Sequence, residues 1–97
     1  MPIYMLATRL QNPELVEKRK ETGEKWLKLV KEKLPDIKWI AHYAILGPYD
    51  FLDIFEAKNE NEAAKVSLLS RSRGAVFAES WTAIPYKYFL GLIKELE

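Results

Sequence analysis

The sequence predicts an α+β fold in which a four-stranded antiparallel sheet carries two helices on one face. Strand-like segments rich in β-branched and aromatic residues alternate with segments of helical periodicity in the order β-α-β-β-α-β. A short turn of sequence Gly-Pro-Tyr-Asp, at residues 47–50, separates the second and third strands. The strands are apolar on both sides, although two helices can cover only one face of a sheet.

Length and composition restrict the protein class. Ninety-seven residues suffice for one hydrophobic core, so we expect residues 1–97 to form a single domain. The net charge of +1 predicts no general attraction to nucleic acid or to anionic membranes. The absence of cysteine excludes disulfides, thiolate metal sites and thiol nucleophiles. No long apolar run and no signal-peptide pattern is visible, so we expect a cytoplasmic protein.

The first strand is predicted over residues 3–10 and precedes a long amphipathic helix. Asn12 and Pro13 supply a cap residue and a proline at the first helical position. Apolar residues then recur at helical spacing to about Lys33. Gly23 falls on this apolar stripe, where we expect it to let the helix approach the sheet closely.

The second and third strands are predicted over residues 37–46 and 51–57, joined as a hairpin. Asn59, followed three residues later by Glu62, resembles a capping box and begins the second helix. Gly74 ends this helix after two arginines, whose charge suits a helix C-terminus.

The fourth strand is predicted over residues 75–84, and Pro85 separates it from a last amphipathic helix. The apolar face of this helix consists of Tyr86, Phe89, Leu90, Ile93 and Leu96. The complete order is the ferredoxin-like plan with an additional C-terminal helix.

The second apolar face of the sheet predicts self-association. Left bare, this face would expose several aromatic side chains in one patch, which monomers rarely tolerate. We therefore expect a second copy to cover it, giving a face-to-face homodimer with a barrel between the two sheets. Whether such dimers form larger oligomers stays open at this point. The alternative is that the C-terminal helix folds back over the same face.

Several segments together resemble a known family. They are the opening Ile-Tyr-Met-Leu at residues 3–6, the long first helix, the turn at 47–50 and the Ser-Trp-Thr-Ala-Ile segment at 80–84. With these segments, nearly the whole chain is similar to the GYD-domain family. The resemblance implies a dimeric α+β barrel but no activity and no catalytic residues. Similar turns occur in the ligand-binding domain of Lrp/AsnC-type regulators, but this chain has no helix-turn-helix segment.

Polar residues inside the strands are candidates for a functional site. Asp53 and Glu79 interrupt apolar strand faces, and His42 is the sole histidine. We expect Asp53 on the open side of the sheet, deep in the dimer cavity, where burial requires it to be paired, hydrogen-bonded or protonated. Close to His42 it would form a proton-transfer pair. The alternative is a solvent-facing His42, with both carboxylates bonded to other neighbours.

A small, partly apolar molecule is the expected ligand, with no cofactor. The residues expected to contact it are Trp39, His42, Tyr43, Tyr49, Asp50, Asp53, Glu79 and Trp81. A metal is not expected, because His42, Asp53 and Glu79 would have to converge to supply its ligands. A shift of one residue within the second strand would exchange Trp39 and Tyr43 for Ile40 and His42 as cavity-facing residues.

Three functions stay open at this point. The first is a homodimeric small-molecule-binding module. The second is a cofactor-independent enzyme, similar to the monooxygenases or isomerases of the dimeric α+β barrel class, with His42 and Asp53 as its acid–base pair. The third is a purely structural or regulatory dimer. For the turn itself we predict a structural role in setting the hairpin, with Tyr49 and Asp50 at a cavity mouth as the alternative.

Overall fold

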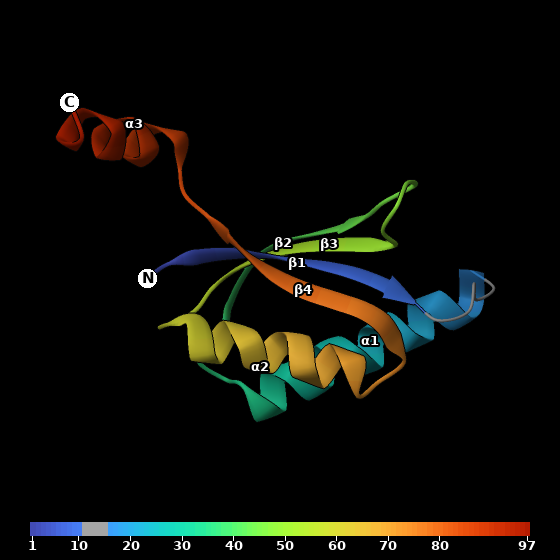
Figure 1. Ribbon diagram of the computed structural model, residues 1–97. Coiled ribbons are helices and arrows are strands. Elements are labelled where there is room, and N and C mark those ends of the chain that lie inside the picture. The colour runs from blue at the N-terminus through green and yellow to red at the C-terminus, as the bar shows by residue number, and fades with distance from the viewer. Residues whose placement is uncertain (11–15) are drawn as a thin grey trace.

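A computed structural model shows a four-stranded antiparallel sheet with three helices, and it describes residues 1–10 and 16–97 (Figure 1). In chain order the elements are β1 (Ile3–Leu10), α1 (Val16–Lys33), β2 (Lys38–Ala44), β3 (Phe51–Glu56), α2 (Glu60–Arg71), β4 (Ala75–Ala83) and α3 (Tyr86–Glu95). The strands lie side by side in the order β2-β3-β1-β4. The predicted ferredoxin-like fold is therefore confirmed. The predicted cap at Asn12 and Pro13 lies outside the described residues.

The hydrophobic core lies between the sheet and the helices α1 and α2, which cover the same face (Figure 1). Its largest fully buried side chains are Leu6 of β1, Phe55 of β3, Val30 of α1 and Val66 of α2. The rings of Tyr4 and Phe55 stack across β1 and β3 with their centroids 5.7 Å apart. Truncating such a side chain to alanine typically costs about 2–5 kcal/mol, so these residues fix the helix layer on the sheet.

A bulge in β2 decides which of its residues face the helices. Trp39 pairs with Phe55 and Ala41 with Ile54, so Ile40 is an extra residue opposite β3. Trp39 and His42 consequently share the helix-covered face, although simple alternation would place them on opposite faces. The sequence predicts either Trp39 and Tyr43 or Ile40 and His42 on one face of β2. The bulge instead places Trp39 and His42 together on the helix-covered face and Tyr43 on the open face. The strand is also shorter than the predicted range 37–46.

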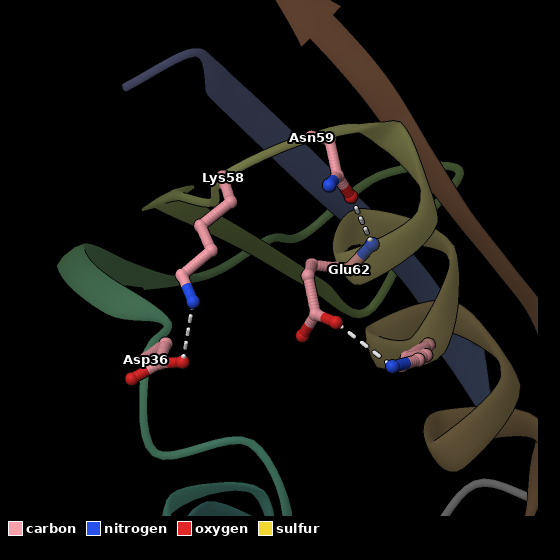
Figure 2. Close-up of polar contacts among 5 residues, drawn as sticks. Asp36, Lys58, Asn59 and Glu62 are labelled. Carbon is pink, nitrogen blue, oxygen red and sulfur yellow. Dashed lines mark hydrogen bonds and ion pairs between the residues drawn. The ribbon is translucent and has the colours of Figure 1, made fainter.

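Helix α2 begins with a side-chain cap (Figure 2). The Asn59 Oδ1 atom accepts a hydrogen bond from the backbone N–H of Glu62 at 3.0 Å. The Glu62 carboxylate accepts from Lys65 Nζ at 2.8 Å. In a complete capping box this carboxylate would instead accept from the backbone N–H of Asn59. Close by, an exposed ion pair of 3.1 Å between Lys58 and Asp36 joins the segments that precede α2 and follow α1.

The face of the sheet opposite α1 and α2 is called the open face here. The strand register places on it the apolar and aromatic residues Ile3, Met5, Ala7, Ala41, Tyr43, Leu52, Ile54, Phe77, Trp81 and Ala83. Helix α3 does not cover it: α3 extends away from the end of β4, contacts no other helix or strand among the described residues, and has only exposed residues (Figure 1). The alternative that α3 folds back over this face is therefore wrong.

None of the helices in the described part of the chain is long and apolar enough to cross a membrane.

The surroundings and backbone angles of two glycines, Gly23 and Gly74, show whether each position requires glycine. A Cβ atom added at Gly23 of α1 or at Gly74, before β4, would meet no atom within 4 Å. The predicted close approach of α1 to the sheet at Gly23 is therefore wrong. Gly74 differs from Gly23 because its φ of +101° is a conformation that favours glycine.

We predict opposite effects of alanine at these positions. Gly23→Ala should raise the free energy of unfolding by about 0.5–1 kcal/mol, because alanine restricts the unfolded chain and favours a helix. Gly74→Ala should lower it by about 1 kcal/mol or more, because of its positive φ. Urea unfolding of both variants measures the two changes. A destabilised Gly23→Ala would mean that α1 approaches another surface there.

Candidate functional site

A pocket of about 700 Å³ lies between α1 and the helix-covered face of the sheet. Its floor comes from all four strands and includes Thr8 of β1, His42 of β2, Asp53 of β3 and Ala75 of β4. On the helix side, its walls include Trp26 and Leu27 of α1, together with Ser70 and Arg73 at the end of α2. The pocket therefore lies within one chain, on the opposite side of the sheet from the open face.

His42 and Asp53 form a hydrogen-bonded pair in this floor. They are cross-strand partners of β2 and β3, and the His42 Nδ1 atom lies 2.7 Å from Asp53 Oδ1. The Asp53 side chain is 8% exposed, whereas that of His42 is 42% exposed. The pair therefore joins a buried carboxylate to an imidazole that solvent and small molecules can reach.

Burial raises the pKa of Asp53 above its ordinary value. The hydrogen bond and the charge of His42 act in the opposite direction but do not cancel the effect of burial. When Asp53 is ionised, it accepts the Nδ1–H of His42 and so fixes the tautomer in which Nε2 carries a lone pair. The pair can then accept a proton, or a hydrogen bond, at Nε2.

The expected position of Asp53 in a cavity on the open face is wrong. Asp53 pairs with Leu6 of β1 and lies on the same face as Phe51 and Phe55, beneath the helices. His42 is on the edge strand, as the alternative interpretation required, but its partner is Asp53 rather than solvent alone. The structure thus brings the two residues together on the face where they were not expected.

Four other candidate residues, Tyr43, Tyr49, Glu79 and Trp81, lie on the open side. Tyr49 contacts Trp81, with ring centroids 5.6 Å apart, and the Arg9 guanidinium lies 5.6 Å from the Tyr49 ring. Trp81 Nε1 donates to Glu79 Oε1 at 3.2 Å. The expected single site is therefore two groups of residues separated by the sheet, because Trp39, His42 and Asp53 lie on the other face.

The turn at residues 47–50 ties the hairpin to the end of β1. Asp50 Oδ2 accepts from the backbone N–H of Leu10 at 2.7 Å, and the Asp50 N–H donates to Thr8 O at 2.8 Å. Arg9 Nε donates to Pro48 O at 2.7 Å. The Asp50 carboxylate thus bonds the neighbouring strand β1. These bonds support the structural interpretation of the turn.

Sequence reasoning missed the helix side of the pocket. Helical periodicity predicts that Trp26 faces inward and leaves the position of Ser70 open, and Arg73 is one of the two arginines interpreted as ordinary basic residues at a helix end. Trp26 Nε1 donates to Ser70 Oγ at 2.9 Å, which connects α1 to α2 and holds the indole at the pocket wall. Periodicity identified the inward position of Trp26, but no signal in the sequence distinguished a pocket wall from packed core.

In the described part of the chain, no three His, Asp or Glu side chains gather closely enough to hold a metal ion.

Two comparisons relate the chain to known proteins. The family model described as "GYD domain" matches residues 7–93. A protein of Thermus thermophilus named "Glutamine synthetase and cystathionine beta-lyase binding protein" is 32% identical over 87 residues, which cover 90% of this chain and 83% of that protein. The predicted resemblance to the GYD-domain family is confirmed, and the Thermus thermophilus relative is named for binding two enzymes.

The buried carboxylate predicts a pH dependence of stability. Because burial raises the pKa of Asp53, the protonated form of this side chain favours the folded state. This stabilising contribution is fully present below the pKa that Asp53 has in the unfolded chain. That contribution is lost as the pH rises through the higher pKa of the folded state. Relative to Asp53→Asn, the wild-type protein should therefore lose stability as the pH rises from strongly acidic towards neutral. The loss is about 1.4 kcal/mol for each unit separating the two pKa values.

Urea unfolding of both proteins over this pH range measures the difference. Asp36→Asn, which removes an exposed carboxylate, is the matched control and should show no such fall. If the wild-type protein instead gains stability over Asp53→Asn with rising pH, the bond to His42 outweighs burial.

Proposed function

Because the chain belongs to the GYD-domain family, we propose that it is a homodimeric binding protein that associates with metabolic enzymes. The observation that carries the proposal is the pair of uncovered apolar surfaces, the open face and α3. The name of the Thermus thermophilus relative supports enzymes as the partners, since that protein is named for binding glutamine synthetase and cystathionine β-lyase.

The open face has the properties of a protein interface. Tyr43 is 53% exposed and Trp81 38% exposed, and both lie among aliphatic residues of β1 and β3. A sheet face that remains in water normally carries alternating polar residues. A contiguous apolar and aromatic face of this kind indicates a partner surface.

A second copy of the chain suits this face because the face is self-complementary in charge. Arg9 and Lys38 share it with Glu56 and Glu79, so two copies related by a two-fold axis can oppose unlike charges around an apolar centre. In such a dimer, Tyr43, Glu79 and Trp81 of each copy border the space between the sheets. The pocket beneath α1 stays accessible in each copy.

Helix α3 is proposed as the surface that contacts the enzymes. It is 10 residues long and contacts none of the other helices and strands that the structure describes. A helix of this length is marginal in water unless tertiary contacts support it. Its exposed apolar side, with Phe89 and Ile93, suits insertion into a hydrophobic groove of another protein.

A second candidate function rests on a separate observation, the 2.7 Å contact between His42 and Asp53 in a pocket. This geometry suits a cofactor-independent enzyme in which His42 Nε2 removes a proton from the substrate and Asp53 orients the imidazole. The binding function is preferred because the relative is named for its protein partners.

We predict that the wild-type protein sediments as a dimer and that Ile54→Lys sediments as a monomer. Ile54 lies on the open face at the centre of the sheet, where a lysine would bring two charges together across the two-fold axis. Leu68→Lys is the matched control, because Leu68 is an exposed leucine on α2. Sedimentation velocity measures the mass, and circular dichroism checks that each variant is folded. A monomeric wild-type protein at micromolar concentration contradicts the face-to-face dimer.

We further predict binding to glutamine synthetase and cystathionine β-lyase of the source organism, measured by biolayer interferometry. Ile93→Glu should weaken this binding at least about tenfold, since it places a charge on the apolar side of α3. Lys87→Glu introduces the same side chain on the other side of α3 and should have little effect. If Ile93→Glu instead abolishes the dimer, α3 belongs to the dimer interface. Wild-type protein that binds neither enzyme contradicts the enzyme partners.

A further inference from the structure

We propose that the pocket between α1 and the sheet is a binding site for a small apolar organic acid, a phenol or a carboxylic acid, whose acidic oxygen meets His42. The site is distinct from the open face and from α3, the surfaces on which the proposed function rests. Binding in the pocket and binding to enzymes can therefore fail independently.

The dimensions and walls of the pocket suit the apolar body of such a molecule. Its volume of about 700 Å³ lies within the range of small-molecule sites, roughly 300–1,000 Å³. Trp26 and Leu27 line it from α1, and Leu10 and Phe51 line it from the sheet. The bond from Trp26 Nε1 to Ser70 Oγ holds one aromatic wall in position.

The floor supplies a proton acceptor. Asp53 is the sole buried charged residue among residues 1–10 and 20–97, for which burial is described, and its bonded partner is His42. A buried carboxylate is costly unless it is paired, and an apolar side chain in its place would avoid that cost. The pairing has a chemical result, since Asp53 holds the Nδ1–H of His42 and leaves the Nε2 lone pair for a ligand.

Proton transfer in the site is balanced without any further reactant. The O–H bond of the ligand breaks, its proton forms an N–H bond at His42 Nε2, and its electron pair stays on the oxygen. The products are a phenolate or carboxylate and an imidazolium, which remain joined as an ion pair. Asp53 stabilises the imidazolium through Nδ1–H.

The surrounding charges favour an anion. Lys20 and Lys25 line the pocket from α1 and Arg73 lines it from the end of α2, whereas Glu24 is the one acidic residue of α1 among the described lining residues. Lys25 also pairs with Glu21 at 3.1 Å. The other uncharged polar side chains among the described lining residues include Thr8, Thr22 and Ser70. An anionic ligand would therefore meet a net positive mouth.

The test uses 4-nitrophenol, whose phenolate is yellow, and 4-nitroanisole, which has the same ring but no acidic proton. We expect the wild-type dimer to bind 4-nitrophenol and to increase its phenolate fraction at a fixed pH, as measured by absorbance. Binding should shift the indole N–H signal of Trp26 in a ¹H–¹⁵N spectrum and leave that of Trp81 unchanged. 4-Nitroanisole should bind at least about tenfold more weakly, because it lacks the charge-assisted bond to His42.

Variants separate the pocket from other surfaces. His42→Gln should weaken 4-nitrophenol binding at least about tenfold and abolish the increase in phenolate. Leu27→Trp should block binding by filling the pocket without altering the pair. Leu68→Lys, which changes an exposed residue of α2 outside the pocket lining, should change neither measurement.

Three results would overturn the proposal. They are no binding of 4-nitrophenol at millimolar concentration, equal binding of 4-nitroanisole, and unchanged binding by folded His42→Gln or Leu27→Trp. Enzyme binding measured on the same proteins reports separately on the proposed function.

Discussion

The bulge at Ile40 is the local constraint on which the arrangement of the candidate site depends. Without the extra residue, Trp39 and His42 would point to opposite faces of the sheet, since side chains alternate along a strand. The bulge brings both onto the helix-covered face, where His42 meets Asp53 and its ring lies 5.2 Å from that of Trp39. It also leaves Tyr43 on the open face. One inserted residue thus separates the chemistry of the pocket from the apolar surface.

The sheet consequently presents two different environments. Beneath the helices, a packed core at Leu6 and Phe55 continues into a pocket with a polar floor. The open face carries an aromatic cluster around Tyr49 and Trp81, which none of the described helices covers. At the end of the sheet, the bond from Leu10 N to the Asp50 carboxylate fixes the hairpin against β1.

The order and approximate bounds of the elements could be predicted because their signals are local. Caps, turn residues and hydrophobic periodicity need no knowledge of the rest of the chain. The grouping of Phe51, Asp53 and Phe55 on one side of β3 was also predictable from alternation. The side of β3 that the helices cover could not be predicted. A carboxylate such as Asp53 is not expected in a core unless a partner for it, here His42, is known. The bulge and the free position of α3 likewise depend on tertiary contacts.

The helix that covers the pocket explains why a cavity exists there at all. Helix α1 is held by Val30 in the core and by the bond from Trp26 to Ser70, both in its second half. At Gly23 it has no neighbour to press against, so the space beneath it stays open. Filling that space with larger side chains would add buried apolar area and stability. The chain instead places the His42–Asp53 pair at the base of the pocket and basic residues at its mouth, which supports the proposed binding of an acidic ligand.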